Sequence, residues 1–153
     1  IVRNIDRLSE EGLKINLALS LHAPNNVVRN KIMDINISNP IEKLMDSILN
    51  FYEKTGNKIT YEYVLLSGVN DAPAHATELV SLCQKFPVFV NIIEYNHIDE
   101  APFYKCKNDH RDAFLAVLKT NKVDAKVRIS RGKDIDAACG QLANRLQSPI
   151  SKL

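Results

Sequence analysis

Hydrophobic residues recur along the chain at two alternating spacings. Residues 14–22, KINLALSLH, place Ile15, Leu17, Leu19 and Leu21 on one side and polar or small residues on the other. This period of two predicts a strand with one buried face. Three later segments, 58–71, 88–96 and 125–130, are rich in β-branched and aromatic residues and predict further strands.

The segments between these strands follow the helical period of 3.6. Residues 39–56 predict a helix capped by Asn39, with Pro40 at its first position and Gly56 as its stop. A second helix is expected from about residue 71 to 85, and a third is expected to be capped near Asn108. Residues 1–14 are charged and helix-like.

Strands that alternate with helical crossovers pair in parallel, so the sequence predicts an α/β fold with right-handed connections. Four strands are too few to close a barrel, and we expect an unpaired sheet edge. The carboxyl ends of parallel strands lie on the same side of a sheet, where ligands collect. Those ends carry Ser20 and His22, then Asp71, then Asn96, and finally residues 130–139.

Composition narrows the class of protein. The chain has 153 residues, 45% of them hydrophobic, and no stretch is long and apolar enough to cross a membrane, which favours a cytoplasmic protein. Its three cysteines fit neither a disulfide framework nor a metal-ligand spacing. Residues 126–153 carry six basic and two acidic side chains, and this basic end is the expected side for a phosphate-bearing partner. Because the chain begins with Ile1, we interpret it as a piece of a larger protein.

Four motifs, in this order, resemble one family. They are LALSLHAPNNVVRNKIMDIN (17–36), YEYVLLSGVND (61–71), VNIIEYN (90–96) and SRGKDIDAACGQLA (130–143). Together they resemble the carboxyl-terminal half of the radical S-adenosylmethionine (SAM) RNA methyltransferases of the RlmN family, of which Cfr is a close relative. The resemblance covers residues 1–146, which we take as one domain, and leaves residues 147–153 as a tail.

The resemblance implies a fold, a reaction and partners. The fold is part of the (β/α) barrel of radical SAM enzymes, and the reaction is methylation of adenine C2 in 23S ribosomal RNA and in tRNA. The cofactors are SAM and a 4Fe-4S cluster, and a reductase or flavodoxin-type protein supplies electrons. The family's Cys-x3-Cys-x2-Cys and Gly-Gly-Glu-Pro segments belong to its amino-terminal half and do not occur in this sequence. No metal ligand is therefore assigned, and the chain alone is expected to be inactive.

The resemblance also assigns residues. Ser20, Leu21 and His22 match a SAM-contacting segment, and Asn96 matches a second SAM contact, although Glu94 stands where the family commonly has proline. The catalytic residue implied is Cys139, which becomes S-methylated and passes the carbon to RNA, because adenine C2 is not nucleophilic enough to take a methyl group from SAM directly.

The residues around Cys139 suit a reactive thiol. Thiolate is a good methyl acceptor, and the small neighbours Ala137, Ala138 and Gly140 permit close approach of the loop. By composition alone, a buried structural thiol is the favoured interpretation of Cys139, and the family motif reverses that preference.

Other interpretations stay open. Ser20, His22 and Asn96 could be ordinary polar residues at strand ends, and Asn70 with Asp71 is most simply a turn and helix cap. Arg131 and Lys133 fit an RNA phosphate contact or a solvated turn, while Cys83 and Cys106 match no motif. The alternative functions are Cfr-like methylation of adenine C8 and a non-catalytic α/β module that binds nucleotide or RNA.

Overall fold

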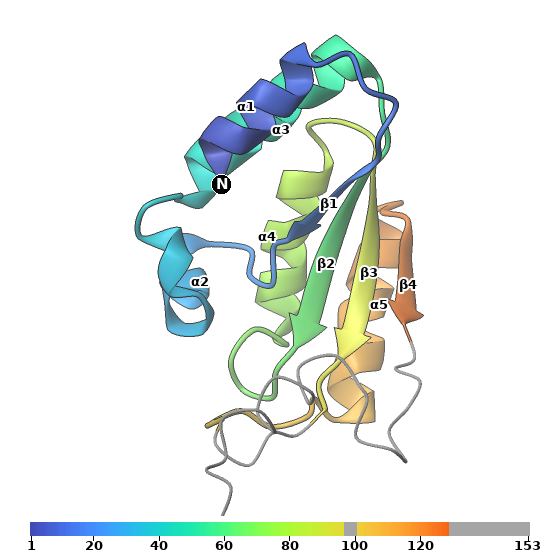
Figure 1. The fold of residues 1–153 in the computed structure, drawn as a ribbon. Helices are drawn as coiled ribbons and strands as arrows, with labels where there is room; N and C mark the ends of the chain where they lie inside the picture. The colour runs from blue at the N-terminus through green and yellow to red at the C-terminus, as the bar shows by residue number, and fades with distance from the viewer. Residues whose placement is uncertain (97–100, 129–153) are drawn as a thin grey trace, which may run out of the picture.

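Four parallel strands form a sheet flanked by helices (Figure 1). The computed structural model describes residues 1–96 and 101–128. Within these ranges no helix has the length and apolar character that crossing a bilayer requires. The elements in chain order are α1 (Val2–Glu10), β1 (Leu17–Ser20), α2 (Asn26–Ile32), the 3₁₀ helix η1 (Asp34–Asn36), α3 (Ile41–Thr55), β2 (Ile59–Leu65), α4 (Pro73–Cys83), β3 (Val88–Glu94), α5 (Asn108–Thr120) and β4 (Ala125–Arg128).

The strand order is β1-β2-β3-β4, and every neighbouring pair is parallel, which confirms the predicted α/β fold. Helical crossovers join successive strands, so all four carboxyl ends lie at one end of the sheet, shown by the arrowheads in Figure 1. We call this end, with the loops that leave it, the carboxyl edge. Within the described residues, β1 and β4 each pair with one strand only, as an open sheet requires.

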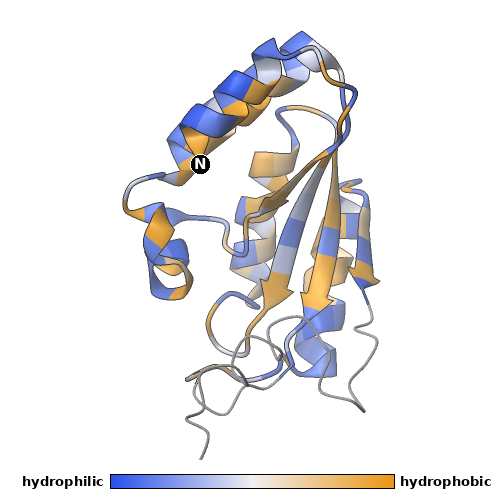
Figure 2. Ribbon diagram, viewed as in Figure 1, coloured by the Kyte–Doolittle hydropathy of each residue, from blue (hydrophilic) through white to orange (hydrophobic). Residues whose placement is uncertain are grey.

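The core lies between one face of the sheet and the helices. Along β2, alternate residues are buried, and two of them are the fully buried Tyr61 and Tyr63. The Tyr61 hydroxyl lies 3.2 Å from the Met45 sulfur of α3, and the Tyr63 ring packs on Phe114 of α5 with centroids 5.4 Å apart. Figure 2 shows the resulting bands of hydrophobic and hydrophilic residues along the strands. The strand predicted within residues 58–71 is therefore confirmed. The period of two predicted for residues 14–22 is confirmed where Leu19 and Leu21 are buried and Ser20 between them is exposed.

The start of α3 corrects one prediction. Pro40, and not Asn39, is the N-cap of α3, and it supplies no side-chain cap. The Asn26 side chain supplies the acceptor for the first turn of α3 instead, because its Oδ1 accepts a hydrogen bond from the Ile41 N–H at 2.9 Å. The Asn39 Oδ1 accepts from the Val2 N–H at 3.1 Å instead. Asn39 therefore serves the first turn of α1, a tertiary contact that local spacing does not reveal.

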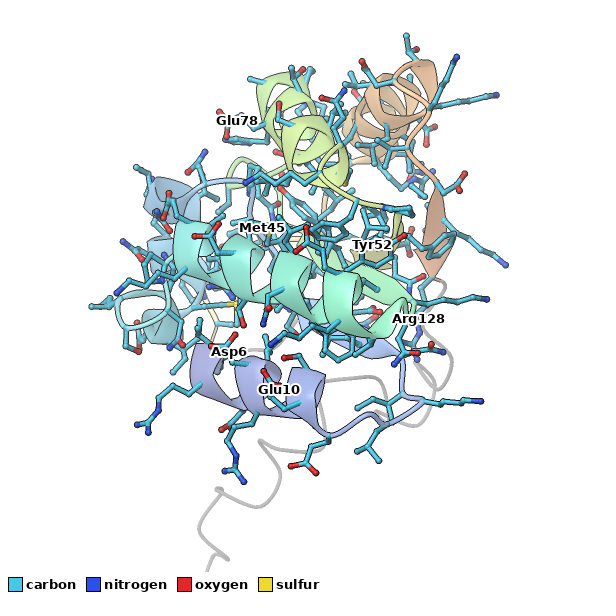
Figure 3. The ribbon with its side chains drawn as sticks, turned by 90° about the horizontal axis from the view of Figure 1, so that it is seen from above. Asp6, Glu10, Met45, Tyr52, Glu78 and Arg128 are labelled. Atoms are coloured by element: carbon cyan, nitrogen blue, oxygen red, sulfur yellow. The ribbon has the colours of Figure 1, made fainter. Side chains whose placement is uncertain are left out.

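Helix α1 packs along α3, and polar pairs join the two (Figure 3). Ser47 of α3 donates to Asp6 Oδ1 of α1 at 2.6 Å, and nearer the carboxyl ends of the two helices Lys54 pairs with Glu10. Gly56 ends α3 as predicted, with φ of 63° and its N–H bonded to the Tyr52 carbonyl. This left-handed conformation carries little strain in glycine.

Candidate cofactor-binding edge of the sheet

Strand β1 delivers the first predicted site residues to the carboxyl edge. Ser20 is its last residue, and the Ser20 side chain is exposed. The Leu21 side chain is fully buried in the core, and its backbone N–H donates to the Glu62 carbonyl at 3.0 Å. Ser20 therefore presents a hydroxyl at this edge, while Leu21 anchors the chain beneath it.

His22 turns the chain away from the sheet in an uncommon conformation. Its φ is 57°, in the left-handed region that few residues other than glycine adopt. Two neighbours from β2 hold it there, because its N–H donates to the Glu62 carbonyl and its Nδ1 accepts from the Val64 N–H at 3.1 Å. The imidazole thus replaces the backbone acceptor that a longer β1 would have offered to Val64.

The environment of His22 disfavours its charged form. Burial lowers its pKa to about 4, and the nearby Arg29 charge adds to the effect. An Nδ1 that accepts from a backbone N–H carries no proton, which agrees with a neutral ring. His22 therefore has its Nε2 as the remaining hydrogen-bonding atom near neutral pH.

We expect His22 to make the protein less stable in acid. The unfolded chain takes up a proton near pH 6.5 but the folded chain only near pH 4, so the free energy of unfolding falls as pH drops from 6.5 to 4. NMR titration of the His22 ring should give a midpoint near 4, and a midpoint near 6.5 would contradict the burial argument. His22→Asn keeps an acceptor for the Val64 N–H and tolerates the positive φ, but it has no imidazole to protonate. The urea midpoint of this variant should therefore fall less between pH 6.5 and pH 4 than that of the wild type.

Arg29 of α2 fixes the exit of β1, a role that the sequence did not predict. The side chain is fully buried. Its Nε donates to the Leu21 carbonyl at 2.9 Å and its Nη2 to the Ser20 carbonyl at 3.1 Å, while Nη1 donates to Asn36 Oδ1 at 2.7 Å. Burial lowers the pKa of Arg29 below its ordinary value. The guanidinium therefore sets the direction in which β1 leaves the sheet.

Asn70 joins the ends of β1 and β2. It is fully buried, and its Nδ2 donates to the carbonyls of His22 at 2.8 Å and Val64 at 2.6 Å. Its Oδ1 accepts from the Leu66 N–H at 2.7 Å. The single amide thus satisfies three backbone groups where two strands end, which makes Asn70 a second structural residue of the site.

Asp71 stabilises the adjacent turn but does not cap α4. Its Oδ1 accepts from the Gly68 N–H at 2.9 Å, and its Oδ2 lies 3.2 Å from His110 Nδ1. The N-cap of α4 is Ala72, which makes no side-chain cap. The predicted turn is confirmed and the predicted helix cap is wrong, because Asp71 lies one residue before the N-cap and its two carboxylate oxygens contact Gly68 and His110 instead.

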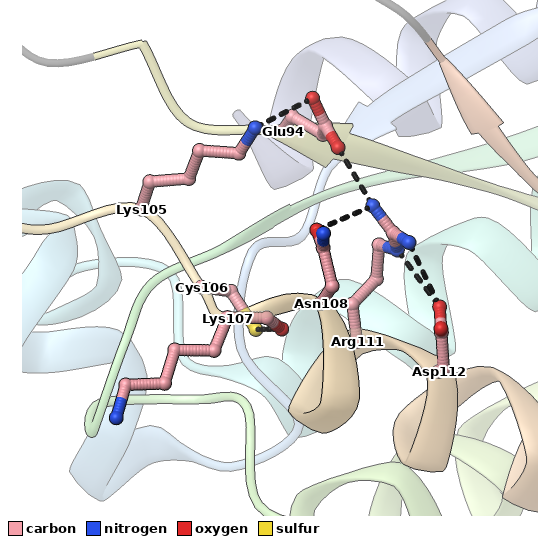
Figure 4. Close-up of polar contacts among 7 residues, drawn as sticks. All are labelled: Glu94, Lys105, Cys106, Lys107, Asn108, Arg111 and Asp112. Carbon is pink, nitrogen blue, oxygen red and sulfur yellow. Dashed lines mark hydrogen bonds and ion pairs between the residues drawn. The ribbon is translucent and has the colours of Figure 1, made fainter.

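Glu94, where the resemblance expects proline, ends β3 in an ion-pair cluster (Figure 4). Its carboxylate accepts from Arg111 of α5 at 2.9 Å and from Lys105 at 3.1 Å. Lys105 also belongs to an isolated bridge with Leu66 beyond β2. The cluster ties the segment after β3 to both α5 and β2. Asn96 follows two residues after β3 and is partly buried.

The face of the sheet opposite α4 and α5 carries a polar row. Strand register aligns Ser20, Glu62, Asn91 and Lys126 across the four strands. Because aligned residues of parallel strands share a face, these side chains lie opposite the buried Tyr61 and its neighbours. In Figure 1, α4 and α5 lie behind the sheet, on the other face.

The predicted site residues thus divide into two groups. Ser20, Leu21 and His22 lie together at the carboxyl edge, and Asn96 follows the end of β3, two strands away. Cys139, Arg131, Lys133 and the 147–153 tail lie outside the described residues. In the described part of the chain, no group of three or more His, Cys, Asp or Glu side chains is placed to hold a metal ion.

A parallel sheet with polar residues gathered at its carboxyl edge defines the class as an α/β protein of the partial-barrel kind. A crystal structure of a radical SAM methyltransferase from Sphaerobacter thermophilus matches with a TM-score of 0.88 and 40% identity, covering 92% of this chain and 41% of that one. A domain of a pyruvate-formate lyase-activating enzyme from Bacteroides vulgatus matches with a TM-score of 0.65 over 83% of this chain and 74% of that one. At 14% identity, this second likeness concerns the fold alone.

Sequence comparison supplies particular relatives. The chain is 47% identical over 143 residues to a probable dual-specificity RNA methyltransferase RlmN of Cytophaga hutchinsonii. It is 46% identical over 148 residues to the protein of the same name from Enterococcus faecalis. The matches cover 94% and 95% of this chain, which confirms the predicted resemblance to RlmN proteins. The chain spans 39% and 42% of the length of these relatives, and no protein-family model matches it.

Proposed function

We propose that the chain is part of a radical SAM RNA methyltransferase that methylates adenine C2 in ribosomal RNA and tRNA. The observation that carries this proposal is the 47% identity, over 94% of the chain, to a protein named as a dual-specificity RNA methyltransferase. The carboxyl edge supports it, because β1 ends there at Ser20 and is followed by His22, and Asn96 follows the end of β3.

The residues at this edge fit an adenosyl group. The Ser20 hydroxyl is exposed and has no hydrogen-bond partner among the described residues, so it is available to a ligand. His22 offers Nε2, since Nδ1 is already bonded to Val64. We therefore propose Ser20 and His22 as direct contacts, Asn96 as a further contact, and Leu21 as the anchor that holds Ser20 in place. SAM supplies both the methyl group and the radical chemistry of the reaction.

The remaining parts of the reaction fall to residues outside the described ranges. We propose Cys139 as the methyl carrier, with Arg131 and Lys133 beside RNA phosphate. The 4Fe-4S cluster and its electron donor are proposed to act through a part of the full-length protein that this chain does not include. The exposed Lys126 and Arg128 on β4 support a basic surface that leads into this segment.

The test is a methylation assay with the full-length protein. The cluster-loaded enzyme, a reductant and SAM carrying a deuterated methyl group are incubated with ribosomal RNA and tRNA transcripts, which are then digested to nucleosides. We expect label in 2-methyladenosine. Label in 8-methyladenosine would show that the methylated carbon is C8, as in the Cfr-like alternative, and not C2. Unlabelled RNA from a cluster-loaded enzyme would overturn the proposal.

A further inference from the structure

Glu62 carries a buried oxygen that the described protein leaves unpaired. The residue lies in the middle of β2 and is only partly exposed. Its Oε1 accepts a hydrogen bond from Asn91 Nδ2 of β3 at 2.8 Å. Its Oε2 is buried and has no hydrogen-bond partner within residues 1–96 and 101–128. Buried polar atoms without partners are rare because each costs free energy, so this oxygen calls for a donor.

Glu62 lies beside the residue that we propose as a cofactor contact. Its register partner on β1 is Ser20, and the two side chains share the face of the sheet opposite α4 and α5. Neighbouring strands are about 4.8 Å apart, so one small molecule can touch both side chains. Ser20 is the last residue of β1, which places this pair at the level where β1 reaches the carboxyl edge.

Nearby side chains do not supply the missing donor. The Asn91 amide is bonded to the other oxygen of Glu62. Lys126 belongs to the same row but lies two strands away, roughly 10 Å, and is exposed. The Arg29 guanidinium is bonded to the carbonyls of Ser20 and Leu21 and to Asn36. Among the described side chains, none therefore donates to Glu62 Oε2, which leaves this oxygen to accept from a ligand.

We propose that Glu62 binds the ribose of the adenosyl group, its unpaired carboxylate oxygen accepting hydrogen bonds from the ribose hydroxyls. This inference rests on the proposed function. An ionised carboxylate has only acceptors to offer, and a vicinal diol presents two donors close together. In dinucleotide-binding folds, too, an acidic side chain accepts a hydrogen bond from a ribose hydroxyl. Asn91 acts as a positioning residue that holds the carboxylate in place.

The test compares two ligands on the cluster-loaded, full-length protein by calorimetry. S-adenosylhomocysteine carries both ribose hydroxyls, and its 2′,3′-dideoxy analogue carries neither. Glu62→Gln keeps the size of the side chain and an acceptor for Asn91 but removes the charge. We expect this variant to bind S-adenosylhomocysteine about 10-fold to 100-fold more weakly, because hydrogen bonds to a charged group are the stronger kind. Its affinity for the dideoxy analogue should change less than about twofold.

Matched variants separate this contact from a general effect. Glu53→Gln makes the same change on the exposed surface of α3 and should leave both affinities unaltered. Glu62→Met removes the carboxylate altogether and should reproduce the loss for S-adenosylhomocysteine. The ribose contact would be overturned, with the proposed function left standing, by either of two results. One is that the wild type and Glu62→Gln bind S-adenosylhomocysteine equally well; the other is that Glu62→Gln loses the same affinity for both ligands. A wild-type protein that binds neither ligand would overturn the proposed function together with it.

Discussion

Replacing Cys139 by alanine in the full-length protein is expected to abolish methyl transfer to RNA. If Cys139 carries the methyl group, its removal leaves adenine C2 without a carbon donor, since this carbon does not take a methyl group directly from SAM. Loss of a covalent nucleophile lowers turnover by far more than loss of a binding contact, and we expect a drop of more than roughly a thousandfold. The assay is the transfer of deuterated methyl to RNA.

The other two cysteines provide matched controls. Burial raises the pKa of Cys83 to about 12, and burial with the nearby Asp71 raises the pKa of Cys106 to about 12. Neither thiol forms a useful fraction of thiolate near neutral pH. Cys83→Ala and Cys106→Ala should therefore retain methyl transfer, with at most a modest loss of stability. Activity that survives in Cys139→Ala, or that disappears in a folded Cys83→Ala protein, would contradict the assignment.

Replacing Arg29 by methionine is expected to lower the free energy of unfolding by about 3 kcal/mol. Methionine fills much of the space but leaves the buried Leu21 carbonyl and Asn36 Oδ1 without their donor. Each unsatisfied buried group costs roughly 1–3 kcal/mol, which is offset in part because a buried charge is also removed. The midpoint of urea unfolding measures the net effect.

Two substitutions sharpen the Arg29 prediction. Arg29→Lys keeps the charge but cannot reach the same acceptors with a planar fork, so it should lose most of the same stability. Lys31→Met removes an exposed cation from the same helix and should change stability by less than about 0.5 kcal/mol. A neutral or stabilising effect of Arg29→Met would show that the guanidinium does not hold the exit of β1.

The elements with strong periodicity could be predicted from the sequence. The alternation that includes Leu19 and Leu21, and the 3.6-residue stripe that ends at Gly56, each record which side chains are buried. Burial follows from local spacing in these segments because a sheet face or a helix stripe packs on one core. The parallel sheet followed from their order.

Helix α2 and its contacts could not be predicted in this way. It has seven residues, too few to show a helical period, and its buried Arg29 is bonded to the Ser20 carbonyl of β1 and to Asn36 of η1. Asn39 failed as the cap of α3 because Asn26, distant along the chain, supplies the acceptor. Glu94 departs from the family pattern, and the structure explains it through Arg111 and Lys105, which no local motif links to it.

The most direct test of the account is the mass of the peptide that contains Cys139. The full-length protein is purified from cells grown with an adequate iron supply and is digested with a protease. The account predicts a population of this peptide heavier by one CH2 group, with fragmentation placing the addition on the Cys139 sulfur, while the Cys83 and Cys106 peptides stay unmodified. A Cys139 peptide found only as the free thiol, in protein that methylates RNA, would contradict it.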